Sequence, residues 1–499
     1  MKSRAMPSRA MTSRAPVLGM ILLAAMLSRT ACILNRPDDL ATDPDAYVAH
    51  AQMIQQGKGF VVPGTDKPTA FRPPGYPFMI AMMPGSTSSP ERAIAMLHIA
   101  AGILTVLLTR QLAEEVGLST MSGNLAALLV ALDPLLIRYS ALPMTEVVSA
   151  LTLTGGMVLW IQFRNRLHLR SAADGEISSG TQENSTSRRT GWLGFLAGIV
   201  LGFSSLVRPI GLVVMAFLSS ELLTSLALAP QEKRSLRSGN LFVRMLKFVS
   251  PCTVSSAGFL LAISPWVTRN FVEFQTFIPA TTHGGYTLAL GNNPDYYRDV
   301  INGDATKPWD GEKLDQWQKR MASEARAAGI AIGDEKATDT WMYSQAFQAI
   351  QSQPANFVRA SWLRIRTFWA ISPTGAVSDV QRLLSSIWYA GLWFAIIGLI
   401  LVRLTCRIAK RMPFFSTKSA PIWLTVLAFQ LMHTFYWTDA RMRAPLMPAL
   451  AVLVALAFRW THAFFTGPLT KGAVNDLYLC DTGIPDSGTG RSAERVTSV

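Results

Sequence analysis

Charged side chains are scarce in this sequence of 499 residues: Asp, Glu, Lys and Arg make up 16% of it, whereas 49% is hydrophobic. Soluble globular domains carry about 25% charged residues. The shortage excludes an ordinary soluble enzyme of this length. The chain is therefore predicted to be embedded in a membrane.

Cysteine is also rare, and the four cysteines (Cys32, Cys252, Cys406 and Cys480) show no paired spacing. They predict neither a disulfide framework nor a metal site. Zinc-ligand spacing and aromatic RNA-binding motifs are missing too, so the net charge of +14 does not indicate a nucleic-acid partner. The basic residues lie in short clusters between apolar runs, and we interpret them as topology signals.

Apolar runs are what the sequence has in quantity. Each is close to the length of about 20 residues that crosses a bilayer as a helix. They lie near residues 16–34, 93–111, 121–137, 144–163, 191–207, 209–228, 248–267, 383–402, 419–437 and 444–460. We predict an all-α polytopic membrane protein with about ten transmembrane helices and two exterior loop regions that carry interfacial helices.

The basic clusters give the expected orientation. With the N-terminus inside, "RNRLHLR", "QEKRSLRSG" and "RLTCRIAKR" all face the cytoplasm, as the positive-inside rule requires. The first apolar run could instead be a cleaved signal peptide, but an uncleaved span closes the topology consistently. The predicted segments are 1–34 (basic segment and first transmembrane helix), 35–92 (first exterior loop), 93–267 (transmembrane helices two to seven), 268–382 (large exterior loop), 383–460 (last three transmembrane helices) and 461–499 (cytoplasmic tail).

The two exterior regions contain helical patterns that do not span. "PDAYVAHAQMIQQG" predicts one amphipathic helix, and residues 74–85 are too short to cross and are expected at the interface. Residues 335–370 predict two more helices. The second of these interleaves Trp with Arg, which is typical of a helix lying on a membrane surface.

Several ionisable side chains fall at the predicted exterior ends of spans. Charge near hydrocarbon costs about 2.5 to 3.5 kcal/mol, so each such group needs a reason. A single arginine could reach lipid phosphates, but this does not explain carboxylates at the same depth. A mixed cluster suits an anionic head group held by guanidinium groups, with a carboxylate kept for proton or metal chemistry. The residues concerned are Asp43, Asp45, Lys67, Arg72, Glu146, Arg208, Arg269, Asp439, Arg441 and Arg443.

Asp43 has two interpretations. Asp is a preferred helix N-cap, Pro44 suits the first helical position and Gly57 suits the stop. Asp43 could equally be a catalytic carboxylate, because one oxygen can cap while the other faces a substrate. Backbone N–H bonds and the helix dipole would then lower its pKa and weaken it as a base, unless burial opposes them.

A series of weak motifs occurs in one order between residues 15 and 460, and the chain resembles the membrane glycosyltransferases of the type-C fold. It is most similar to the family 39-like group, which includes protein O-mannosyltransferases and lipid A aminoarabinose transferases. "DPDAY" resembles the Asp-Glu-x-x-Tyr signature, with Asp43 and Tyr47 at matching positions and Pro44 in place of the acid. "FRPPGYPF" resembles the basic-Pro-x-x-Tyr segment that follows, and "PMTEVV" matches an acidic residue of the second exterior loop. Later landmarks are "SLVRPIGL", "SPWVTRNF", "IPATTHGGYTLALGNNPDYY" and "DARMRAPLMPAL".

The resemblance implies a polyprenyl-phosphate sugar donor and a glycan, lipid or protein acceptor, joined at the exterior membrane face. Asp43 and Glu146 are the expected catalytic residues, with Asp43 as base. The leaving phosphate is expected at Arg72, Arg208, Arg441 and Arg443. The other expected substrate-binding residues are Asp45, Tyr47, Lys67, Tyr76, Arg269, His283, Tyr286, Asn292, Asn293 and Asp439. A divalent metal on Asp43 and Glu146 stays open, and no other cofactor is predicted.

Two other functions fit parts of the sequence. Asp133 and Glu221 within apolar runs would suit a transporter of an anionic lipid or sugar, but no paired repeat is apparent. Pro44 in the signature would suit a catalytically inactive relative in an envelope assembly. The segment with His283 and Asn292 could also be a glycine-punctuated turn. The expected location is a bacterial inner membrane, with the site facing the periplasm.

Overall fold

The computed structural model describes residues 15–173, 180–228, 241–303, 309, 311–372, 378–410 and 418–466. Within these residues the protein is helical and has no β-strand, apart from an isolated antiparallel bridge between Val61 and Pro68. The prediction of an all-α fold is confirmed.

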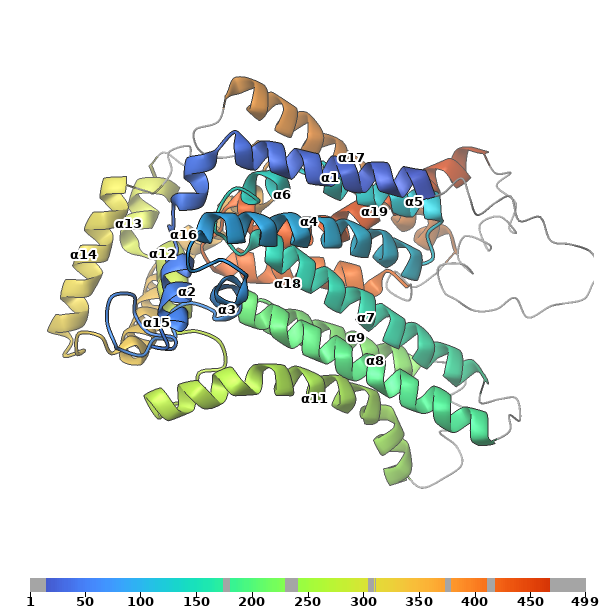
Figure 1. Ribbon diagram of the computed structural model, residues 1–499, viewed down its shortest axis with the longest axis horizontal. Helices are drawn as coiled ribbons and strands as arrows, with labels where there is room; N and C mark the ends of the chain where they lie inside the picture. Colours follow the sequence, from blue (N-terminus) through green and yellow to red (C-terminus); the bar gives the residue numbers. More distant parts are fainter. Residues whose placement is uncertain are drawn as a thin grey trace, which may run out of the picture.

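A bundle of mostly long helices runs along the longest axis of the molecule, together with the short helix α6 (Figure 1). They are α1 (Ala15–Leu34), α4 (Pro90–Glu115), α5 (Thr120–Ala131), α6 (Pro134–Tyr139), α7 (Glu146–Ala173), α8 (Gly180–Val207), α9 (Gly211–Leu228), α11 (Leu241–Phe274), α17 (Asp379–Lys410), α18 (Ala420–Phe435) and α19 (Met447–Thr466). Every predicted apolar run lies on one or more of these helices. Among the described residues, six helical segments are long and apolar enough to cross a membrane, and three shorter apolar helices accompany them.

The third apolar run is not one continuous helix. It is divided into α5 and α6 at Asp133, whose Oδ1 accepts a hydrogen bond from the Leu136 N–H at 2.9 Å. Pro134 occupies the first position of α6, where its missing N–H costs nothing. A capping acid followed by proline starts a new helix, and this signal outweighs the apolar composition.

The centre of the bundle is formed by α7 and α19, whereas α1 and α17 lie at its edge. About four-fifths of the apolar window is buried for the two central helices (78% and 83%), against 17% and 22% for the two outer ones. The backbones of α8 and α11 are in direct contact at Gly198. A Cβ at this position would collide with the Ser255 carbonyl, so only glycine allows the helices to approach this closely.

Shorter helices gather at one end of the bundle and form what we call the end lobe (Figure 1). Its elements are α2 (Tyr47–Gln55), α3 (Gly75–Met82), α12 (Gly284–Gly291), α13 (Pro294–Tyr296), the π-helical turn η3 (Tyr297–Ile301), α14 (Gly311–Ala327), α15 (Glu335–Ser352) and α16 (Pro354–Phe368). The predicted helices at 74–85 and 335–370 correspond to α3 and to α15 with α16. Helices α12 and α14 were not predicted. Two 3₁₀ turns, η2 (Pro37–Ala41) and η4 (Ala440–Leu446), complete the described elements.

Helix α15 ties the end lobe together. Glu335 Oε2 accepts hydrogen bonds from the Ala70 N–H and the Thr282 hydroxyl, both at 2.9 Å. One turn later, Asp339 Oδ1 accepts from the Gly285 N–H at 2.7 Å. The segment before α3 and the start of α12 are thereby held against one helix, and both carry predicted site residues.

Candidate active site

Asp43 lies just before α2 and uses one oxygen to hold its first turn. Asp43 Oδ2 accepts from the Ala49 N–H at 2.9 Å, while Oδ1 is buried without a hydrogen-bond partner. The helix starts later than predicted, because Tyr47 is its first residue and Ala46, at φ 59°, is its N-cap. Pro44 is therefore outside the helix, and the carboxylate caps from three residues before the N-cap. The predicted stop at Gly57 is confirmed, since α2 ends at Gln55 and Gly57 has a φ of 74°.

Burial raises the pKa of the Asp43 carboxyl above its ordinary value. The backbone N–H groups of Ala49, Val48 and Tyr47 act in the opposite direction but do not outweigh it. The expected weakening of Asp43 as a base by these N–H bonds is thus overcome by removal from water.

Asp45 and Arg72 form an ion pair beside Asp43. Arg72 Nη2 donates to Asp45 Oδ1 at 2.7 Å, and both side chains are about one-fifth exposed (21% and 20%). The guanidinium also lies over the rings of Tyr47 and Phe71, at 5.9 and 5.4 Å from their centroids. The two segments of the first loop are thereby joined.

Glu146 and Arg208 come from two other elements and meet in the same region. Glu146 is the first residue of α7 and only 1% exposed, and Arg208 lies in the turn between α8 and α9. Arg208 Nη1 is 3.7 Å from Glu146 Oε1, beyond hydrogen-bond distance. Both Glu146 oxygens and Arg208 Nη1 are buried without hydrogen-bond partners. A fully buried carboxylate and a mostly buried guanidinium that lack hydrogen-bond partners are expected at a ligand site.

Arg441 brings the turn η4 to the same cluster. Its guanidinium interacts electrostatically with Glu146, Tyr139, Asp45 and Asp439. Asp439 is the N-cap of η4, and its Oδ1 accepts from the Arg441 N–H at 3.4 Å.

Two tyrosines lie between the carboxylates. Tyr47 is buried and interacts electrostatically with Asp45, Arg72, Arg208 and Glu146; burial raises its pKa to about 12. Tyr76, on α3, is fully buried, and its ring meets the Tyr47 ring edge-on at 5.3 Å. Its electrostatic partners are Glu146, Tyr47 and Asp43.

His283 and Tyr286 close the cluster on the side of the end lobe. Their rings stack at 5.0 Å, and His283 Nε2 is 3.5 Å from Arg72 Nη1. Burial, reinforced by Arg72, lowers the pKa of His283 to about 3, so the ring is neutral at physiological pH. His283 Nδ1 is buried without a partner. The Tyr286 hydroxyl accepts from Gln318 Nε2 at 2.6 Å.

Five of the predicted site residues contact other parts of the protein and not this cluster. Arg269 donates to the carbonyls of Thr69 and Phe60 at 2.8 and 2.6 Å and so holds the loop before α3. Lys67, in that loop, is exposed. Arg443 is buried, donates to the Phe368 carbonyl at 2.6 Å and lies over the Tyr389 ring at 4.4 Å.

The two asparagines have structural contacts as well. Asn292 accepts from Arg364 Nη2 at 2.7 Å and donates to the Phe435 carbonyl. Asn293 caps α13 through the Tyr296 N–H at 2.8 Å. The sequence predicted that these two residues bind substrate. In the structure both side-chain amides hydrogen-bond to backbone groups instead.

The acidic residues that suggested a transporter have partners. Glu221 is buried in an ion pair with Arg164, Oε1 to Nη2 at 2.8 Å. Asp133 caps α6 and accepts from the Tyr389 hydroxyl at 3.2 Å.

The described residues contain no group of three His, Cys, Asp or Glu side chains that could hold a metal. Asp43 already binds backbone N–H groups, and Glu146 faces two arginines that supply positive charge. No third described His, Cys, Asp or Glu joins these two acids as a ligand, and we derive no step through a divalent ion.

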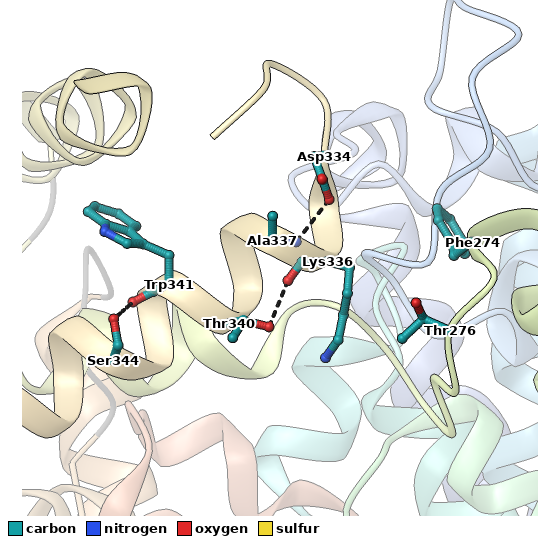
Figure 2. A pocket seen from close by; sticks show the side chains of 8 residues that line it. All are labelled: Phe274, Thr276, Asp334, Lys336, Ala337, Thr340, Trp341 and Ser344. Atoms are coloured by element: carbon teal, nitrogen blue, oxygen red, sulfur yellow. Dashed lines mark hydrogen bonds between the residues drawn. The ribbon is translucent and has the colours of Figure 1, made fainter. Parts of the chain in front are cut away.

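A separate groove of about 550 Å³ lies on the end lobe (Figure 2). Its lining comes from the end of α11 and the first turns of α15: Phe274, Thr276, Asp334, Lys336, Ala337, Thr340, Trp341 and Ser344. None of the clustered carboxylates or arginines described above lines it.

Residues 75–271 match the family model of dolichyl-phosphate-mannose-protein mannosyltransferases. Two structures of the Archaeoglobus fulgidus oligosaccharyltransferase also match, one tethered to an acceptor peptide that contains the NVT sequon and one, of AglB, in complex with an inhibitory peptide and a dolichol-phosphate. Each is 16% identical with a TM-score of 0.51 and covers 94% of this chain. This chain has the type-C membrane glycosyltransferase fold. The resemblance predicted from the sequence is therefore confirmed.

The chain with this type-C fold spans about half the length of those two structures (53% and 54%). No curated protein matches its sequence. The family match begins at α3 and ends in α11, so it includes Tyr76, Glu146 and Arg208 but stops before His283 and Arg441.

Proposed function

We propose that this chain is an integral-membrane glycosyltransferase that moves a sugar from a polyprenyl-phosphate donor to an acceptor hydroxyl. One observation carries the proposal: carboxylate oxygens of Asp43 and Glu146 and the Nη1 of Arg208 lie in one cluster, and each is buried without a hydrogen-bond partner. Leaving such groups without partners costs about 1 to 3 kcal/mol each. A phosphate and an acceptor hydroxyl would supply the missing partners.

Asp43 Oδ1 is the proposed base. The acceptor O–H bond breaks as its oxygen attacks the sugar carbon, and the proton passes to Asp43. The bond from that carbon to the phosphate oxygen breaks, and polyprenyl phosphate leaves with the electron pair. Because its pKa is raised, Asp43 holds this proton better than an exposed aspartate does.

The arginines stabilise the leaving phosphate. Arg208 is the best placed, because its Nη1 has no hydrogen-bond partner and faces the site. Arg441 and Arg72 share their charge with nearby acids and orient the cluster. Fixed guanidinium donors of this kind are worth most where water is scarce. His283 and Tyr286 present a neutral ring and a phenol on the end-lobe side, which suits sugar contacts.

The proposed donor enters from the bilayer, and the end lobe faces the periplasm of a bacterial inner membrane. Apolar helices of membrane-spanning length in the bundle support the first point. The basic cluster "RNRLHLR" near the end of α7, remote from Glu146, supports the second. The acceptor is a hydroxyl of a glycan, lipid or protein that reaches the end lobe.

The test compares Asp43→Asn with Asp38→Asn, an exposed acid of the same loop. Cells that lack the protein are expected to accumulate a lipid-linked sugar, detected by mass spectrometry of lipid extracts. Cells that carry Asp43→Asn should still accumulate the lipid-linked sugar, because the substitution lowers the turnover rate by about 10² to 10⁴-fold. Asp38→Asn should restore the normal profile. Equal membrane levels of both variants are required. Normal products from Asp43→Asn would contradict the proposed base.

A further inference from the structure

Tyr76 is linked to a buried histidine that the sequence did not single out. The Tyr76 hydroxyl lies 2.8 Å from His98 Nε2, and His98 Nδ1 lies 3.1 Å from the Ser140 carbonyl oxygen. Tyr76 and His98 are both fully buried. His98 belongs to α4, which supplies no other residue of the charged cluster.

The contacts fix which atoms carry protons. A carbonyl oxygen only accepts, so Nδ1 of His98 must be the protonated nitrogen. In the neutral ring Nε2 is then an acceptor, and the Tyr76 O–H must donate to it. The chain of bonds therefore runs in one direction, from Tyr76 through His98 to Ser140.

The two ends of this chain adjoin the two segments that carry the proposed catalytic acids. On one side, the Tyr76 ring packs edge-on against Tyr47, whose helix α2 is held at its start by Asp43. On the other side, Ser140 is the C-cap of α6 and begins the short connection to Glu146, the first residue of α7. His98 is hydrogen-bonded both to Tyr76 and to the Ser140 carbonyl, and so connects α3 with the end of α6.

We propose that His98 is a positioning residue that holds Asp43 in register with Glu146 through Tyr76 and Ser140. It touches neither substrate nor reacting atoms. This inference rests on the proposed function, because it concerns the same site. A misplacement of about 1 Å in such a site can cost about 100-fold in rate, so the link matters more than its two hydrogen bonds suggest.

The test uses His98→Phe, which keeps a ring but loses both hydrogen bonds, and Tyr76→Phe, which loses only the O–H. Each should lower kcat by about 10- to 100-fold with little change in the donor KM, because geometry and not binding is affected. The double variant should be no slower than the slower single variant, because both changes break one chain. His168→Phe, a change of a partly exposed histidine near the far end of α7, is the control and should keep full activity.

A merely structural role predicts a different outcome. In that case, loss of activity would follow the loss of folded protein, and kcat per folded molecule would be unchanged in a thermal-shift-calibrated assay. Our inference also predicts a change in the pH dependence of kcat. In His98→Phe, Asp43 would be less firmly held and more hydrated, so its pKa would fall and the acidic limb of the kcat profile would move to lower pH. Full kcat and an unmoved limb would overturn it. If Asp43→Asn were itself fully active, the proposed function would fail first, so the two failures are distinguishable.

Discussion

At the scale of single residues, Asp43 shows how one side chain can satisfy two interpretations. The sequence allowed both a cap and a base at this position. In the structure Oδ2 accepts from the Ala49 N–H, and Oδ1 is buried without a hydrogen-bond partner, as the proposed base requires. The sequence could not decide between them, because burial depends on Tyr47, Tyr76 and the segments that pack over them. Asn292 and Asn293 show the reverse case, in which residue types suited to sugar binding are used for backbone contacts.

The raised pKa of Asp43 predicts opposite effects of Asp43→Asn on activity and on stability. An acid whose folded-state pKa is raised contributes stability at pH values below its unfolded pKa of about 3.9, and this contribution is lost as the pH rises through the folded value. Asparagine does not ionise, so Asp43→Asn avoids the loss of stability that ionisation causes, and its amide oxygen can still accept from the Ala49 N–H. We therefore expect its melting temperature in detergent to equal or exceed that of wild type at pH 7, with the gap closing near pH 4.

The same shift sets the acid limit of activity. The base must be ionised, so wild-type kcat should fall as the pH drops through a value above about 3.9. His283 adds no limb near neutrality, since its pKa of about 3 keeps it neutral there. A pH–rate profile and melting curves at both pH values check the two parts. If Asp43→Asn were less stable than wild type at pH 7, ionisation of Asp43 would not destabilise the fold, and the raised pKa would be contradicted.

At the scale of helices, length and apolar composition predicted most elements correctly. The two helices predicted within residues 335–370 correspond closely to α15 and α16, because Pro354 marks the start of the second helix. Helix α12 was missed because "GGYTLALG" has the glycines of a turn, yet Asp339 accepts from the Gly285 N–H and holds its first turn. Helix α14 is polar on most of its surface, and a few buried side chains such as Trp317 anchor it.

The close packing of α3 against the end of α8 makes Gly75 a sensitive position. A Cβ there would lie 2.9 Å from the Leu206 carbonyl carbon and oxygen, and 3.0 Å from Val207 Cγ2. Two of these atoms are backbone, so Gly75→Ala must push α3 away, at a cost of about 1 to 3 kcal/mol. Tyr76 follows on one side and Arg208 on the other, so kcat should fall even in the folded fraction.

Gly391→Ala is the matched control for that substitution. Gly391 lies in α17 with open space where a Cβ would be, and alanine is favoured over glycine in a helix by up to about 1 kcal/mol. We expect unchanged kcat and an equal or higher melting temperature. Detergent melting curves and turnover on the same preparations measure both. An active, stable Gly75→Ala variant would show that α3 can move without disturbing the site.

At the scale of the whole molecule, the convergence of the site is the least predictable feature. Four separate parts of the chain supply Asp43, Glu146, Arg208 and Arg441. These residues meet because the start of α7, the end of α8 and the turn η4 lie at the same end of the bundle. Topology predicted that these groups share one face. It could not predict that Arg443, two residues after Arg441, turns into the bundle toward Tyr389. Residues two apart in a 3₁₀ turn point to different sides, and two arginines give no sequence signal that tells which one faces the site.

The two ends of the bundle should lie on opposite sides of the membrane. Ile332, between α14 and α15 of the end lobe, is 80% exposed, and Met121, in the first turn of α5, is 84% exposed. The basic cluster "RNRLHLR" lies at the end of α7 that is remote from Glu146. Positively charged ends are retained in the cytoplasm, so the end lobe should face outward.

Single cysteines at these two positions test the orientation in a chain whose four native cysteines are changed to serine. A membrane-impermeant maleimide should label Ile332→Cys in intact cells, and should label Met121→Cys only after the membrane is opened. The two positions are matched in exposure, so a difference reports the side of the membrane and not accessibility. Labelling of Met121→Cys alone in intact cells would place the carboxylates and arginines at the cytoplasmic face. A donor sugar would then have to be presented from inside, and the proposed acceptor at the outer surface would be out of reach.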